Sequence, residues 1–212
     1  MSNNKVQNVA LNLDAQNALT PDSVLENLMN GNQRFIDNAN YSFDNHALRS
    51  QTTGGQFPKA VILSCIDSRV PVETIFDQSI GDVFVSRVAG NIVNPDILGS
   101  LEYSCKVAGS KIVMVLGHEA CGAVKAACDH VELGNITHLL SNITPAVDAV
   151  KTDGERSSKN NAFVADVIKE NVNMTIERIR KESPILEEME KNGEIKMVGG
   201  VYFLNSGKVE LI

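Results

Sequence analysis

The apolar positions of this chain fall into short runs rich in β-branched residues, separated by segments with apolar residues at helical spacing. Runs of the first kind are typical of buried strands, and segments of the second kind are typical of amphipathic helices. The predicted strands are 60–64, 82–88 and 111–116, and the predicted helices are 97–108, 162–182 and one that opens near residue 121. Because strands and helices alternate, the pattern predicts an α/β fold with a mostly parallel central β-sheet flanked by helices.

The N-terminal part of the chain has fewer apolar positions. At Thr20-Pro21-Asp22 a hydroxyl stands where a helix N-cap is expected, and a proline occupies the first helical position. We therefore expect an N-terminal arm and a helix within residues 1–40. Residues 38–55 are polar with few apolar positions, which predicts an irregular connection into the first strand.

The C-terminal part predicts one more helix boundary and two further strands. A solvated loop over 153–161 precedes the long helix, which should end before Pro184 because the residue before a proline disfavours helical backbone angles. Residues 195–204 and 208–212 have strand patterns, and a turn at 205–207 joins them.

Composition limits the classes of protein to consider. With 212 residues, 43% of them hydrophobic, the chain can bury one full core, so we expect a single domain over 1–212 with its core over 56–212. The formal net charge of -7 argues against a nucleic-acid partner, because such binding depends on clustered lysines and arginines. No apolar segment approaches the roughly 20 residues that cross a bilayer, so no membrane partner is expected. Without a recognisable secretory signal we expect a cytoplasmic protein, although a periplasmic protein whose signal had been removed would look the same.

Three side chains that bind metals follow the ends of two predicted strands. Cys65 comes directly after the strand 60–64, and His118 and Cys121 come shortly after the strand 111–116. The carboxyl ends of parallel strands meet at one edge of a sheet, so these residues converge if the two strands are neighbours. Two thiolates and an imidazole suit zinc, and three protein ligands leave the fourth position to water. The sequence therefore predicts one catalytic zinc ion per chain.

An acidic and a basic residue lie close in sequence to the first of these ligands. Asp67 is close enough in sequence to Cys65 to accept a hydrogen bond from a zinc-bound hydroxide, and Arg69 can hold the carboxylate in a forked ion pair that keeps it ionised. The pair would then orient the hydroxide as a nucleophile. An unpaired Asp67 would instead be a fourth zinc ligand in a closed, inactive state.

The remaining cysteines and histidines are interpreted as structural or solvent-exposed residues. Four cysteines are too few and too widely spaced for a disulfide scaffold, so reduced thiols are expected. Cys105 and Cys128 lie in apolar surroundings and are interpreted as structural. The histidines assigned to solvent are His46, His130 and His138.

With these motifs, Cys65-Ile66-Asp67-Ser68-Arg69-Val70 and His118-Glu119-Ala120-Cys121-Gly122, the sequence closely resembles the beta-class carbonic anhydrases. The similarity extends over about 56–128, with a weaker match at Val201-Tyr202. The resemblance implies a zinc lyase, a carbonate dehydratase, that converts carbon dioxide to bicarbonate and a proton on the three ligands above, with Asp67 and Arg69 as the catalytic dyad. It also implies a homodimer or homotetramer.

The resemblance extends to the substrate pocket. In the plant-like branch of the family, positions equivalent to Gln56, Phe84 and Tyr103 line the carbon dioxide pocket near the subunit interface, and Gly122 matches a residue whose backbone amide faces the substrate. Another branch is gated by bicarbonate through a pocket lined by tryptophan. This chain has no tryptophan, although Arg87 and Tyr202 match other members of that gate, so we expect the open, water-bound form.

Other functions remain open from the residues alone. A related group with the same motifs hydrolyses carbon disulfide or carbonyl sulfide. A non-enzymatic structural zinc protein would need a fourth permanent ligand, for which Asp67 is the nearby candidate. A cysteine phosphatase is a poor match, because only three residues separate Cys65 from Arg69 and its phosphate loop needs five.

Overall fold

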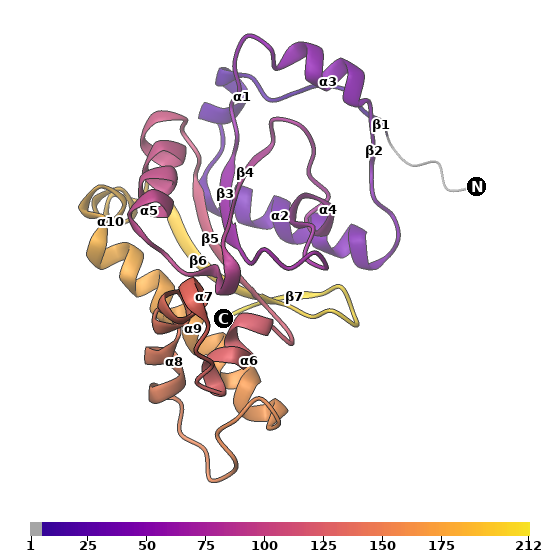
Figure 1. Ribbon diagram of the computed structural model, residues 1–212. Helices are drawn as coiled ribbons and strands as arrows, with labels where there is room; N and C mark the ends of the chain where they lie inside the picture. The colour runs from indigo at the N-terminus through magenta and orange to yellow at the C-terminus, as the bar shows by residue number, and fades with distance from the viewer. Residues whose placement is uncertain (1–5) are drawn as a thin grey trace.

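The computed structural model describes residues 6–212, so the first five residues of the predicted arm lie outside the described part (Figure 1). A five-stranded sheet with the order β4-β3-β5-β6-β7 forms its centre. The strands are β3 (Ala60–Ser64), β4 (Val83–Arg87), β5 (Ile112–His118), β6 (Lys196–Tyr202) and β7 (Val209–Leu211). The first four pair in parallel and β7 pairs antiparallel with β6, which confirms the mostly parallel sheet.

Helices surround this sheet. They are α1 (Leu13–Asn17), α2 (Pro21–Ile36), α3 (Asn45–Gln51), α4 (Val72–Ile75), α5 (Pro95–Glu102), α6 (Gly122–Cys128), α7 (Gly134–Ser141), α8 (Thr144–Ala149), α9 (Asn161–Glu182) and α10 (Pro184–Lys191). Two short helices are not α-helical, namely the 3₁₀ helix η1 (Ala89–Asn91) and the π-helix η2 (Tyr103–Val107). Outside the main sheet, β1 (Val6–Gln7) and β2 (Ser42–Phe43) form a small parallel pair.

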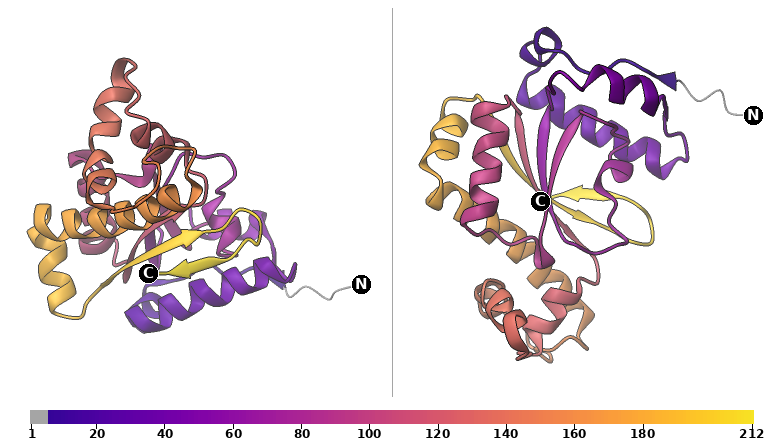
Figure 2. Two further views of the ribbon diagram at one scale, coloured as in Figure 1. Left: turned by 90° about the horizontal axis from the view of Figure 1, so that it is seen from below. Right: turned by 45° about the horizontal axis from the view of Figure 1, so that its top comes forward.

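Both faces of the sheet are buried, which explains why its central strands β3 and β5 are buried at every position and are apolar until they reach Ser64 and His118 at their carboxyl ends. On β3, Ala60 and Ile62 pack with residues of α2 and α4, whereas Val61 and Leu63 pack with residues of α5, α9 and α10 on the opposite face. Figure 2 shows α2 and α9 lying across opposite sides of the sheet. The helices thereby hold the strand ends rigidly in place.

Helix α2 begins where the sequence predicts. The Thr20 side chain accepts a hydrogen bond from the Ser23 amide, and the Ser23 hydroxyl accepts one from the Thr20 amide, so the first turn is capped from both sides. Further along, the buried Asn32 donates to the carbonyls of Ile75 and Gly207 and accepts from the Val209 amide. These bonds fasten α2 to the C-terminal strand.

The connection predicted over 38–55 is not irregular throughout, and this prediction is wrong in its middle part. Asp44 caps α3 by accepting a hydrogen bond from the Ala47 amide, and Leu48 is buried on the inner side of that helix. One buried leucine in a seven-residue helix is too weak a periodic signal to stand out from a polar segment.

Two further boundaries differ from the prediction. Asn94 caps α5 through the Ile97 amide, so the helix expected at 97 begins at Pro95. Pro184 ends α9 as expected, but it also opens α10, because proline is well suited to the first turn of a helix and Ser183 caps that turn. The helix after Cys121, the loop 153–161 and the two C-terminal strands are confirmed.

Gly31 of α2 lies against the backbone of Phe76, the residue that ends α4. A Cβ atom at this position would lie 1.9 Å from the Phe76 carbonyl oxygen, and that oxygen belongs to the backbone. We expect Gly31→Ala to lower the free energy of unfolding by about 3 kcal/mol, although alanine normally favours a helix over glycine. Urea denaturation would measure the loss. The exposed neighbour Asn30 supplies the control, since Asn30→Ala should leave stability equal or slightly higher.

Candidate metal centre

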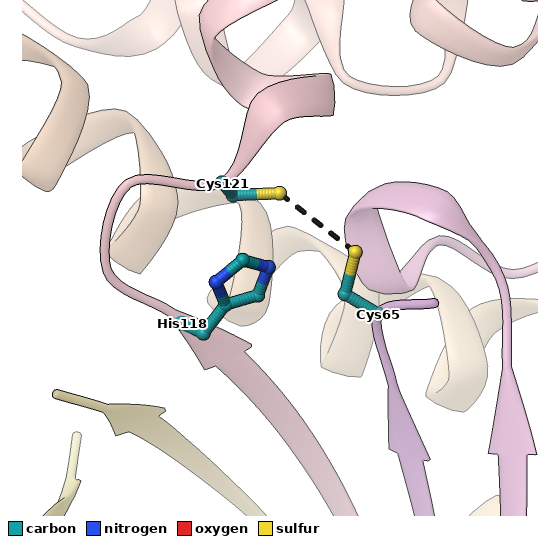
Figure 3. Close-up of side chains that lie close together, drawn as sticks. All are labelled: Cys65, His118 and Cys121. Carbon is teal, nitrogen blue, oxygen red and sulfur yellow. Dashed lines mark hydrogen bonds between the residues drawn. The ribbon is translucent and has the colours of Figure 1, made fainter. Parts of the chain in front are cut away.

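The three predicted metal ligands meet at the carboxyl edge of the sheet. Cys65 directly follows β3, His118 is the last residue of β5, and Cys121 is the N-cap of α6. Because β3 and β5 are adjacent parallel strands, their ends bring the side chains together, as predicted (Figure 3). All three residues are buried, and their ligand atoms lie within 4.8 Å of one another.

The spacing of the two thiols suits a tetrahedral zinc site. The Sγ atoms of Cys65 and Cys121 are 4.0 Å apart, too far for a disulfide. Two thiolates bound to one zinc ion at ordinary bond lengths lie about 3.8 Å apart in tetrahedral geometry. The pair therefore needs little movement to hold a metal.

His118 presents a free nitrogen to the same space. Its Nδ1 atom lies 2.9 Å from the Glu119 carbonyl oxygen, which can only accept a hydrogen bond, so Nδ1 carries the proton. The Nε2 atom is then an acceptor, and it is buried without a hydrogen-bond partner among residues 6–212. A buried nitrogen lone pair without a partner is costly, and a metal ion would satisfy it. This arrangement fits zinc on chemical grounds.

The two thiols affect each other's ionisation. The hydrogen bond from Cys121 is the largest factor that lowers the pKa of Cys65, and the same contact raises the pKa of Cys121. Two bare thiolates at this distance would repel each other, so without a metal they share one proton. A cation between the two sulfur atoms removes that repulsion and allows both to ionise.

Asp67 and Arg69 form the forked ion pair that the sequence predicts. The guanidinium of Arg69 donates to both carboxylate oxygens, at 2.9 and 2.7 Å, and the Arg69 amide donates to the first of them. These bonds lower the pKa of Asp67, so the carboxylate stays ionised at neutral pH. Its Oδ2 atom lies 3.8 Å from His118 Nε2, which places the carboxylate beside the cluster.

Arg87 supports the loop that carries this pair. From the end of β4 its side chain donates to the carbonyl oxygens of Cys65 and Asp67, at 2.8 and 2.6 Å. Reasoning from the sequence linked Arg87 only to a gated pocket and missed this supporting role. A residue 22 positions from Cys65 gives no local signal of such a contact.

The residues predicted to line the substrate pocket are only partly brought together. The rings of Phe84 and Tyr103 meet edge to face, with centroids 6.1 Å apart, in a groove of about 620 Å³ between β4 and α5. Gln56 is exposed in the connection between α3 and β3, and Gly122 is exposed at the first position of α6 with open space where a Cβ would stand. Their roles toward a substrate stay predictions.

The other cysteines and histidines behave as expected. Cys105 and Cys128 are buried and free, and burial raises the pKa of Cys105 to about 12 and raises that of Cys128 as well. All three remaining histidines are exposed, namely His46, His130 and His138. Two further backbone contacts at the cluster were missed, the Glu119 carbonyl on His118 and the Gly90 amide, 3.4 Å from Cys65 Sγ.

Together, the parallel sheet and the Cys-His-Cys cluster at its carboxyl edge define an α/β protein with a three-ligand metal centre that is compatible with zinc. Within residues 6–212, no helix has the length and apolar character needed to span a membrane.

Known proteins with this combination include the beta-class carbonic anhydrases. The carbonic anhydrase family model matches residues 60–209. Carbonic anhydrase 2 of Mycobacterium tuberculosis is 33% identical over 193 residues, which cover 87% of this chain and 89% of the relative. A carbonic anhydrase of Mycolicibacterium smegmatis is 35% identical over 190 residues, with the same coverage. The chain therefore belongs to the beta-class carbonic anhydrases and is a carbonate dehydratase.

Solved structures agree with this assignment. A beta-carbonic anhydrase of Coccomyxa, solved in complex with acetazolamide, superposes with a TM-score of 0.70 at 27% identity, covering 89% of this chain and 86% of that one. One of two tetrameric beta-carbonic anhydrases of Sordaria macrospora superposes with a TM-score of 0.69 at 24% identity, covering 79% and 87% of the two chains, and this second likeness concerns the fold alone.

Proposed function

We propose that the chain hydrates carbon dioxide to bicarbonate and a proton at one zinc ion held by Cys65, His118 and Cys121. The observation that carries this proposal is the unpartnered Nε2 atom of His118, buried and facing two thiols at zinc-binding distance. When bound, zinc supplies a Lewis acid that makes water a nucleophile near neutral pH. The membership in the carbonic anhydrase family supports the same reaction.

Asp67 and Arg69 would position the water nucleophile. A carboxylate kept ionised by Arg69 can accept a hydrogen bond but cannot donate one, so the water must donate to Asp67. This fixes the direction of the oxygen lone pair that attacks the carbon of carbon dioxide. The paired state of Asp67 also supports the open, plant-like form of the site, since a carboxylate held by Arg69 is less available as a fourth ligand.

A direct assay tests the proposal. Purified protein should contain one zinc ion per chain and should accelerate carbon dioxide hydration in a stopped-flow measurement between about pH 7 and 9. A parallel assay with carbon disulfide and carbonyl sulfide distinguishes carbon dioxide hydration from the alternative reaction, hydrolysis of these sulfur gases at the same site. Full zinc occupancy with turnover of the sulfur gases alone, or with no turnover, would contradict the proposed reaction.

We further propose that the groove beside β4 is covered by a second copy of the chain, in a homodimer or homotetramer. β4 is an outer strand of the sheet, and Tyr103 and Val107, one helical turn apart on η2, are 53% and 71% exposed. Exposed apolar side chains along an open sheet edge are typical of subunit interfaces. The tetrameric Sordaria macrospora proteins support this assembly.

Light scattering coupled to size-exclusion chromatography would test the interface. We expect the wild-type protein to be at least a dimer, and Val107→Glu to shift it toward monomer because a charge would be buried in the contact. The matched control is Ile185→Glu, which places the same charge at another exposed apolar position, on α10. A monomeric wild-type protein, or equal effects of both substitutions, would count against this interface.

A further inference from the structure

The turn that follows β4 lies against one of the proposed zinc ligands. Its residues Gly90 and Asn91 both have left-handed backbone angles, with φ of 73° and 44°. Gly90 has no room for a side chain, since a Cβ atom would lie 2.5 Å from Ile143 Cδ1. The amide of Gly90 donates to Cys65 Sγ at 3.4 Å. Two successive left-handed residues are unfavourable for most sequences, so other contacts must hold this turn.

Helix α9 supplies such a contact from the opposite side. Asn171 lies in the middle of this 22-residue helix and is only 3% exposed. Its Nδ2 atom donates to the Gly90 carbonyl oxygen at 2.9 Å, a buried hydrogen bond between residues 81 positions apart. Two helical turns later, Arg178 donates to the Val93 carbonyl at 3.2 Å. One side of α9 therefore fastens the turn at Gly90 and the chain just beyond it.

A buried asparagine in a helix that packs on a sheet needs an explanation. Most of the surrounding positions of α9 that face inward are apolar, as Val167, Ile168, Val172 and Ile176 are, and Thr175 is a further buried polar residue. Burying an amide among them is unfavourable unless its hydrogen bonds are made. The bond to Gly90 gives the Nδ2 donor a partner and places it one peptide unit away from the group that contacts Cys65.

We propose that Asn171 is a positioning residue of the metal centre, which holds Gly90 so that its amide donates a hydrogen bond to the Cys65 sulfur. This inference rests on the proposed zinc site. An N–H···S bond withdraws electron density from a thiolate, and it also holds the sulfur atom with its lone pairs directed at the metal. Its loss should therefore both raise the electron density on sulfur and leave the ligand less firmly positioned. Partners of this kind around metal ligands commonly change metal affinity or activity by about 10- to 100-fold.

Cobalt(II) in place of zinc makes the sulfur ligands visible, because the thiolate-to-cobalt charge-transfer band reports the electron density on sulfur. Asn171→Leu keeps a similar side-chain size and removes the donor. We expect the band to move to longer wavelength, and zinc transfer from the zinc-loaded variant to a chelator to become about 10- to 100-fold faster. Asn171→Ala gives the same comparison if the leucine variant does not fold.

Two control variants on the same helix distinguish a role of Asn171 in positioning Gly90 from a general loss of stability of α9. Asn173→Leu makes the identical change at an exposed position, and Arg178→Ala removes the contact with Val93 while leaving the bond to Gly90. Both should keep the wild-type band, even if Arg178→Ala lowers the melting temperature. A folded Asn171 variant with an unshifted band would overturn the inference. A wild-type protein without any thiolate-to-cobalt band would instead refute the zinc site itself.

Discussion

Replacing Cys65 with alanine is expected to abolish zinc binding and carbon dioxide hydration together. The substitution leaves His118 and Cys121 as the only members of the cluster, and two protein ligands hold zinc far more weakly than three. We expect zinc content to fall from one ion per chain to below about 0.1. Hydration should fall to the rate of the uncatalysed reaction. Metal analysis and stopped-flow hydration on one sample would measure both.

Cys105→Ala is the matched control for this prediction. Cys105 is equally buried and free, but it packs in the apolar cluster between α5 and α9 rather than at the strand ends. Its replacement should cost about 1–2 kcal/mol of stability through lost packing, with zinc content and hydration unchanged. Hydration that survives in a zinc-free Cys65→Ala protein would contradict the zinc mechanism.

Replacing Asp67 with asparagine should lower hydration strongly while zinc stays bound. The asparagine side chain is nearly the same size, but it carries an amide donor in place of one carboxylate oxygen and no longer neutralises Arg69. The water nucleophile then loses its charged carboxylate acceptor and faces an amide instead. We expect hydration to fall by about 100- to 10,000-fold, the range typical of a lost acid-base group, with about one zinc ion per chain retained.

The pH dependence of the rate gives a second check on the role of Asp67, and the carboxylate of Asp129 supplies a control. Because Arg69 lowers the pKa of Asp67, protonation of Asp67 should not limit the wild-type rate between about pH 7 and 9. Asp129 lies at the other end of α6, where the Ser158 amide donates to it and lowers its pKa. Asp129→Asn should therefore keep the wild-type rate. Equal losses in both variants, or loss of zinc from Asp67→Asn, would argue for a structural role.

Much of this protein is determined by short-range features of its sequence. Buried strands such as β3 and β5 are continuous apolar runs, and α2 carries its own capping residues, so each is visible within a window of a few residues. The types and spacing of Cys65, His118 and Cys121 likewise predict a metal site before any fold is known. Helices α3 and α10 were missed because their stability depends on one or two buried side chains each.

The tertiary structure decided what surrounds the three proposed metal ligands. The parallel pairing of β3 with β5 brings Cys65 beside His118 across more than 50 residues of chain, and Arg87 and Asn171 reach the site from separate elements. Hydrogen bonds of this kind depend on where strands and helices are placed in space, and no local periodicity encodes them. The sequence thus determined which atoms can bind zinc, whereas the packing of β4 and α9 determined how those atoms are oriented and held.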